Sequence, residues 1–169
     1  MKRLVRELMK SKKLYNFETL KPQDRICDAL AKMSSANCTA IVVVQDKSLV
    51  GMFSEKDFVR GALASNINLF TPIQDVTTSA VYYVDPDYTI ENCMRIMSEK
   101  HFRHLPVIEN GEVKAVLSMR HIMEFLVADK ETQINDLMVY ITGSGQSHVI
   151  GTREGGVPPL ITNSVITDG

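Results

Sequence analysis

The 169-residue chain has few cysteines, and none of them forms a CxxC pair. Three cysteines are too few and too widely spaced for a disulfide framework or a cysteine-rich zinc site. We therefore expect Cys27, Cys38 and Cys93 to be small buried hydrophobic residues of a reduced, cytoplasmic protein.

A surplus of charge of one sign is also missing, because 19 basic residues face 20 acidic ones and the net charge is −1. A protein that binds nucleic acid through its overall charge normally has a basic surplus, so we expect no nucleic-acid partner. No stretch approaches the roughly 18 consecutive apolar residues of a membrane span, so we expect no membrane partner either. The basic start, residues 1–13, lacks the apolar core of a signal peptide.

What the sequence does contain is an internal repeat. Residues 19–63 fall on residues 83–127 when they are shifted by sixty-four positions, without a gap. Two copies are too few for a solenoid, so we expect them to pack on each other with the functional cleft between them. The identical pairs include Pro22 and Pro86, Ile26 and Ile90, Met33 and Met97, Ser34 and Ser98, Val43 and Val107, and Ser54 and Ser118.

Each copy is predicted to run helix, strand, strand, helix, because 3–4 apolar spacing alternates with β-branched runs. We expect a short helical turn before each copy, at 5–9 and at 73–76, and a Gly- and Pro-rich tail. The expected domains are 1–70, 71–141 and the tail 142–169. The expected elements start at or span Pro22, 39–44, 49–53 and Ser54 in the first copy, and Pro86, 105–108, 113–117 and Ser118 in the second.

The most informative motif is Gly51-Met-Phe-Ser-Glu-Lys-Asp57, at a strand-to-helix junction. Gly51 is expected to let a ligand approach the backbone closely. Ser54 and Asp57 lie three residues apart on one helix face and can bond two neighbouring hydroxyls, as on a ribose. The alternative is a capping box, in which the same Ser-x-x-acid pattern only starts the helix.

The second copy of this motif differs at the acid. His121 stands where the first copy has Asp57, and Ala115 stands where it has Gly51. Ser118 can still cap its helix. Histidine is a poor substitute for a carboxylate that accepts two hydroxyl protons, so we expect the two copies to bind unequally.

Taken together, the stretches 51–57, 102–108 and 116–122 resemble a tandem pair of CBS domains, the Bateman module, and the resemblance covers roughly residues 1–141. It implies an α/β (α+β) fold of two β-α-β-β-α repeats packed sheet to sheet about a pseudo-twofold axis. The two clefts of such modules typically bind AMP, ADP or ATP, and sometimes S-adenosylmethionine or a dinucleotide such as NAD(H). The modules sense ligands or regulate a partner protein and are not catalysts.

Family positions imply a nucleotide site in the cleft that contains Asp57. Ser54 and Asp57 would bind the ribose, with Met52 and Lys56 nearby. Basic side chains facing a phosphate are chemically sensible, because arginine is the preferred phosphate partner. The remaining implied contacts to base and phosphate are Thr39, Val81, Tyr82, Tyr83, Phe102, Arg103, His104, Pro106 and Arg120.

Three classes of function remain at this stage. The first is an adenosine-nucleotide sensor that acts through a regulated partner or as a homodimer. The second is an interaction module whose clefts are empty and whose Ser54 and Asp57 only cap a helix. An enzyme is disfavoured, because no nucleophile–base pair or Gly-rich phosphate loop is present. A metal site at His101, His104 and His121 is disfavoured too, because no Cys or carboxylate spacing completes it.

Overall fold

The computed structural model of the chain describes residues 2–64 and 67–142. Two compact units divide the chain, Met1–Glu131 and Thr132–Gly169, and both repeats lie in the first. The tail predicted for residues 142–169 lies outside the described residues beyond Thr142. No helix within the described ranges is long and apolar enough to cross a membrane.

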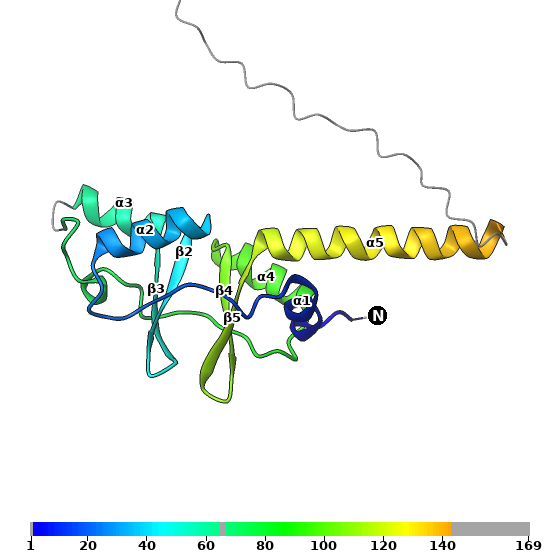
Figure 1. Ribbon diagram of the computed structural model, residues 1–169, viewed down its shortest axis with the longest axis horizontal. Coiled ribbons are helices and arrows are strands. Elements are labelled where there is room, and N and C mark those ends of the chain that lie inside the picture. The colour runs from blue at the N-terminus through cyan, green and yellow to red at the C-terminus, as the bar shows by residue number, and fades with distance from the viewer. Residues whose placement is uncertain (1, 65–66, 143–169) are drawn as a thin grey trace, which may run out of the picture. The chain divides into compact units, whose positions relative to one another are not determined.

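The first repeat forms a three-stranded sheet with two helices (Figure 1). The central strand β2 pairs in parallel with β1 and antiparallel with β3. Four consecutive buried residues at the start of β2 fit this central place, because β-branched side chains pack well in a covered strand. The elements are β1 (Thr19–Leu20), α2 (Ile26–Ala36), β2 (Ala40–Gln45), β3 (Ser48–Ser54) and α3 (Glu55–Leu63).

The second repeat follows the same course, with β4 antiparallel to β5. Its counterpart of β1 is reduced to one parallel bridge between Val84 and Val107. That bridge lies sixty-four positions after the pairing of Leu20 with Val43, so the internal repeat and the expected mixed α/β fold are confirmed. The elements are α4 (Ile90–Lys100), β4 (His104–Glu109), β5 (Glu112–Ser118) and α5 (Met119–Thr142).

The prediction that Pro22 and Pro86 open helices is wrong, because the helices begin four residues later, at Ile26 and Ile90. Each proline lies in the segment before the helix, and its carbonyl accepts a backbone hydrogen bond. Pro22 accepts from the N–H of Gln74 at 3.0 Å, and Pro86 accepts from that of Arg6 at 2.8 Å. The prolines therefore join the chain to the two lead-in turns.

The lead-in turns predicted at 5–9 and 73–76 are present as α1 (Val5–Lys12) and the short 3-10 helix η1 (Ile73–Asp75). Each packs into the core of the repeat that it does not precede. Val5, Leu8 and Met9 of α1 lie in the core of the second repeat. Ile73 of η1 lies in the core of the first.

Because each lead-in turn packs in the core of the other repeat, the boundary between the two cores differs from the boundary between the two repeats in sequence. The sequence places α1 in domain 1–70, and the three buried side chains of this helix, Val5, Leu8 and Met9, lie in the core of the second repeat. Lys12 of α1 also forms a 2.9 Å ion pair with Glu124 of α5. Neither repeat therefore has a complete core of its own, and we expect the two to unfold together.

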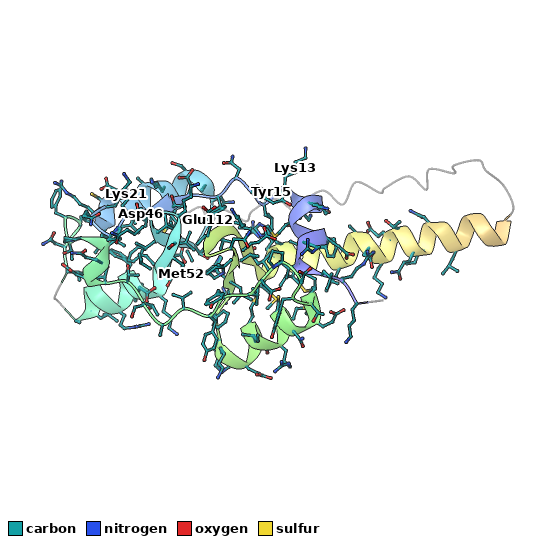
Figure 2. The ribbon with its side chains drawn as sticks, turned by 90° about the horizontal axis from the view of Figure 1, so that it is seen from below. Lys13, Tyr15, Lys21, Asp46, Met52 and Glu112 are labelled. Atoms are coloured by element: carbon teal, nitrogen blue, oxygen red, sulfur yellow. The ribbon has the colours of Figure 1, made fainter. Side chains whose placement is uncertain are left out.

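The two hairpins meet at their tips, where Figure 2 labels Asp46 and Glu112. The N–H of Val113 donates to the carbonyl of Lys47 at 3.0 Å, and the Lys47 ammonium lies 3.6 Å from a Glu112 carboxylate oxygen. These bonds connect the sheet of one repeat to the sheet of the other.

Burial of the cysteines is less complete than expected. All three are free thiols, but only Cys93 is buried, and Cys27 and Cys38 are partly exposed. Burial raises the pKa of the Cys93 thiol to about 12. Cys93 therefore packs as a neutral hydrophobic side chain in the second core.

The role expected for Gly51 is wrong. A Cβ at this position would overlap Thr77 Cγ2 and approach the Thr78 carbonyl to 3.1 Å. The space above Gly51 is thus filled by the segment entering the second repeat, not by a ligand. Its counterpart Ala115 is fully buried.

We predict that Gly51→Ala lowers the free energy of unfolding by about 1–3 kcal/mol, the usual cost of overpacking. Thr77→Ser removes the overlapping methyl but keeps the hydroxyl that donates to the Ile73 carbonyl at 2.6 Å. The double variant should therefore regain most of the lost stability in urea unfolding. A double variant as unstable as Gly51→Ala alone would contradict this packing.

Candidate functional site

Two cavities lie between the repeats. One, of about 430 Å³, is named here the Asp57 cavity, and the other, of about 600 Å³, the His121 cavity. Met52 lines the first and Lys13 the second, and both are labelled in Figure 2. The Asp57 cavity is lined by Thr39, Ala40, Met52, Ser54, Glu55, Lys56, Asp57, Arg60, Thr78, Ala80, Val81, Tyr82, Lys100, His101, Phe102, Arg103 and His104.

The two cavities are built alike. Each takes a strand-to-helix motif from one repeat and a lead-in segment from the other, and matching residues differ by sixty-four positions. Residues 78–82 enter the Asp57 cavity where residues 14–18 enter the His121 cavity. The remaining His121 lining is Lys12, Lys13, Ala36, Asn37, Cys38, Thr39, Ala40, Arg103, His104, Val116, Ser118, Met119, Arg120 and His121.

A common wall separates the cavities. Thr39, Ala40, Arg103 and His104 line both. The Thr39 hydroxyl and His104 Nε2 lie 3.4 Å apart, across the boundary between the repeats. An ion that binds Arg103 from one side therefore changes the electrostatics of the other side.

Ser54 and Asp57 form the capping box at the start of α3. Asp57 is buried, and its Oδ2 accepts from the Ser54 N–H at 2.9 Å and from the Ser54 hydroxyl at 2.6 Å. The Asp57 N–H in turn donates to Ser54 Oγ at 3.4 Å. The box starts α3 and fixes the carboxylate at the cavity wall.

Thr78 and Arg60 also contact the Asp57 carboxylate. The sequence motif did not reveal either contact. The Thr78 hydroxyl donates to Asp57 Oδ1 at 3.1 Å, and the Arg60 guanidinium lies 3.6 Å from the same oxygen. Thr78 comes from the segment between the repeats, which has no motif. Arg60 lies one turn after the aspartate on α3, a spacing that alone predicts the ion pair.

Most of the residues predicted for the nucleotide site do line the Asp57 cavity. Tyr83, Pro106 and Arg120 do not. Tyr83 is exposed, at 61%, and lines neither cavity. Pro106 is buried in β4, where its carbonyl accepts from Val84 N–H at 3.0 Å.

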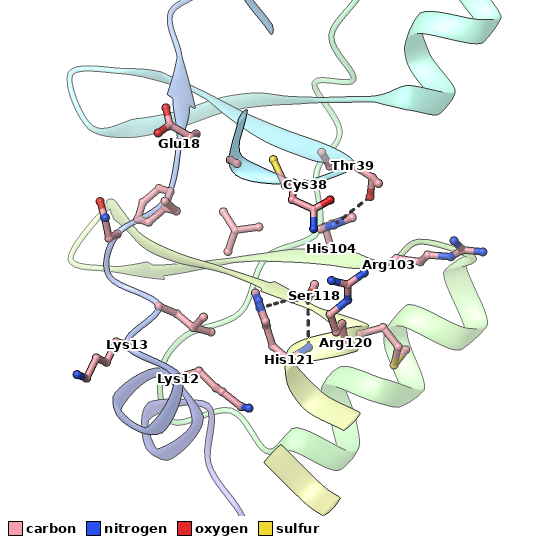
Figure 3. Close-up of a pocket in the computed structure, with 18 residues that line it drawn as sticks. Lys12, Lys13, Glu18, Cys38, Thr39, Arg103, His104, Ser118, Arg120 and His121 are labelled. Carbon is pink, nitrogen blue, oxygen red and sulfur yellow. Dashed lines mark hydrogen bonds between the residues drawn. The ribbon is translucent and has the colours of Figure 1, made fainter. Parts of the chain in front are cut away.

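The placement of Arg120 with Asp57 is wrong. Arg120 is the second residue of α5, sixty-four positions after Lys56. It lines the His121 cavity, beside Ser118 and His121 (Figure 3). This placement agrees with its position in the second copy of the repeat, where it is the equivalent of Lys56.

An aromatic pair closes one side of the Asp57 cavity. The Tyr82 and Phe102 rings are stacked, with centroids 5.6 Å apart and planes 23° from parallel. The Lys100 ammonium lies 5.6 Å from the centre of the Tyr82 ring. Tyr82 is half exposed, so the pair presents an apolar surface to whatever enters.

In the His121 cavity the imidazole takes over the capping role. His121 Nδ1 accepts from the Ser118 N–H at 3.2 Å, and the His121 N–H donates to Ser118 Oγ at 3.2 Å (Figure 3). A neutral ring whose Nδ1 accepts must carry its proton on Nε2. The side chain that replaces Asp57 is therefore a hydrogen-bond donor.

Both histidines that line the His121 cavity favour the neutral form. Burial, reinforced by His121 and Arg103, lowers the pKa of His104 to about 4. Burial also lowers the pKa of His121, and Lys12 and Arg120 act in the same direction against Glu124. Within the described ranges, no group of three or more His, Cys, Asp and Glu residues is placed to hold a metal ion.

Comparison with known proteins agrees with this arrangement. The family model of the CBS domain matches residues 5–63 and 73–128. The chain is a CBS-domain protein. It is similar to the mitochondrial CBS domain-containing protein CBSX3 of Arabidopsis thaliana, with 25% identity over 71% of this chain and 61% of that protein. The chain thus spans about three fifths of that relative.

Solved structures show the same fold. The crystal structure of the CBS domain NE2398 has 30% identity and a TM-score of 0.70, over 75% of this chain and 99% of that one. A crystal structure of CBSX2 in complex with AMP has 22% identity and a TM-score of 0.59, over 68% of this chain and 90% of that one. The expected pair of CBS repeats is therefore confirmed.

The low pKa of His104 predicts a loss of stability in acid. A histidine with an ordinary pKa of 6.5 in the unfolded chain and about 4 in the folded one contributes fully above pH 6.5, and its contribution is lost as the pH falls toward 4. Between pH 7 and pH 5 we expect its share of the loss to be about 1–2 kcal/mol. In urea unfolding, His104→Gln should lose that much less stability over this interval than the unmodified chain. Equal losses would contradict the assignment.

Proposed function

We propose that this protein is a regulatory module that binds one adenosine nucleotide, AMP, ADP or ATP, in the Asp57 cavity and passes that signal to a partner. The observation that carries the proposal is the combination found in this cavity. A buried carboxylate, a stacked aromatic pair and several cations line one hollow of about 430 Å³. A ribose, a base and a phosphate require these three kinds of group.

The Asp57 carboxylate has a free acceptor position with which it can bind a ribose hydroxyl. An ionised carboxylate offers about four acceptor positions. The Ser54 N–H, the Ser54 hydroxyl and the Thr78 hydroxyl fill three of them. One position is left for a ribose hydroxyl, and rotation of either protein hydroxyl toward the ligand frees a second. Capping and ribose binding are therefore compatible in the same residues.

Base and phosphate can be placed around this point. The exposed face of the Tyr82–Phe102 pair offers a stacking surface for adenine, next to Val81 and Met52. Lys56, Arg103, His104 and Thr39 also line the cavity and can bind phosphate oxygens. That CBSX2, a structure of similar fold, is a complex with AMP supports this choice of ligand.

A second candidate is an interaction module that binds no nucleotide. The completeness of the capping box favours it, because Asp57 is already hydrogen-bonded within the chain. S-adenosylmethionine and NAD(H) are further adenosyl ligands that the same groups can bind. For either candidate we propose a non-catalytic homodimer in the cytoplasm, where free thiols such as Cys27 and Cys38 stay reduced.

The test compares Asp57→Asn with the matched variant His121→Asn. Asparagine keeps an oxygen that can accept from the N–H of Ser54 or Ser118, so both variants retain a cap. Because a hydrogen bond to a charged group contributes about 1.5–3 kcal/mol, Asp57→Asn should weaken AMP binding by about 10- to 150-fold. His121→Asn should change it by less than about twofold. Calorimetric titration with AMP measures both.

Thermal unfolding of the two variants controls for loss of structure. If folded Asp57→Asn binds AMP as tightly as the unmodified chain, the ribose assignment is wrong. If the unmodified chain binds none of AMP, ADP, ATP, NADH and S-adenosylmethionine, the interaction module becomes the better account.

A further inference from the structure

The His121 cavity has the same construction as the Asp57 cavity but a different chemistry. At the positions of the aromatic pair, Tyr82 and Phe102, it has Glu18 and Cys38. At the position of the buried carboxylate it has His121. The stacked pair and the acceptor for a sugar diol are therefore replaced, and the aromatic residue in this lining is the single ring of Phe17.

The imidazole that replaces the carboxylate favours a ligand with hydrogen-bond acceptors instead of donors. His121 Nδ1 is occupied by the Ser118 N–H at 3.2 Å, so the neutral ring offers an N–H at Nε2. On protonation the ring would also become a cation. In either state His121 suits a hydrogen-bond acceptor, where Asp57 suits a donor.

The charges around this cavity agree with that polarity. Lys12, Lys13, Arg103 and Arg120 line it, against the single carboxylate of Glu18. Lys12 is paired with Glu124 at 2.9 Å. Among residues 2–64 and 67–142, no ion pair engages the other three cations. Unpaired cations in one concave site attract anions, and arginine binds phosphate oxygens with two parallel hydrogen bonds.

We propose that the His121 cavity binds a phosphate-type anion through Arg120, His121 and Arg103, without requiring a ribose or a base. The ligand class is phosphate, diphosphate or a small compound that carries one of these groups and has no nucleoside. The wall residues Arg103 and His104 connect this site to the Asp57 cavity. The proposal goes beyond nucleotide binding and does not rest on it.

The experiment is a calorimetric titration of the full chain with inorganic pyrophosphate, a probe with neither sugar nor base. The internal repeat supplies a matched pair of variants, because Arg120 and Lys56 are the same position in the two cavities. Arg120→Gln should weaken pyrophosphate binding by about tenfold or more, as expected when a charge-assisted hydrogen bond is lost. Lys56→Gln reports any pyrophosphate that binds in the Asp57 cavity, and Lys21→Gln, at an exposed lysine that lines neither cavity, should change binding by less than about twofold.

A third variant, His121→Asp, reverses the polarity of the site. It gives the start of α5 the same capping acid that Asp57 provides at the start of α3. It should abolish pyrophosphate binding while the helix start remains capped, which thermal unfolding verifies. Because AMP is not used, failure of the proposed nucleotide site leaves these results unaffected.

Three results would overturn the proposal. The first is no pyrophosphate binding by the unmodified chain at millimolar concentration. The second is weaker binding in Lys56→Gln but not in Arg120→Gln, which places the anion in the Asp57 cavity. The third is an equal effect of both substitutions, or unaltered binding in folded His121→Asp, which reduces the interaction to unspecific charge attraction.

Discussion

The exchange of lead-in segments is the constraint on which the rest of this structure depends. Val5, Leu8 and Met9 fill the core of the second repeat, and Ile73 fills that of the first. Because each core needs a segment from outside its own repeat, the two sheets are held in one unit. The same crossing delivers residues 14–18 to one cavity and 78–82 to the other. The crossing of the two lead-in segments therefore determines both how the cores are packed and which residues line the cavities.

The two copies of the repeat carry the same capping arrangement with opposite polarity. In both, a serine starts the helix and a side chain three residues later bonds back to the serine N–H. Asp57 makes that side chain an acceptor, and His121 makes it a donor. One substitution that keeps the cap therefore changes which ligand atoms the cavity suits. The shared residues Arg103 and His104 give the two boxes a common wall through which each can affect the other.

The sequence predicted what a repeat and a local pattern can encode. The offset of sixty-four, the paired hairpins and the Ser54–Asp57 box follow from residue identities alone. It did not predict that α1 packs on the second repeat, because amphipathic spacing shows that a helix has an apolar face and not which core receives it. Thr78 was missed because its segment carries no motif, and Arg120 was assigned to the wrong cavity because only the family position was used to place it. Gly51 was misread because its neighbour, Thr77, is remote in sequence.

The central claim is that the two cavities differ in kind, so that only the one with the carboxylate binds a nucleotide. The most direct measurement is the number of AMP molecules bound per chain, from calorimetric titration of a protein sample of known folded concentration. The account predicts one AMP per chain at saturation. Two AMP molecules bound per chain with equal affinity would contradict it, because the exchange of Asp57 for His121 would then have no consequence for nucleotide recognition.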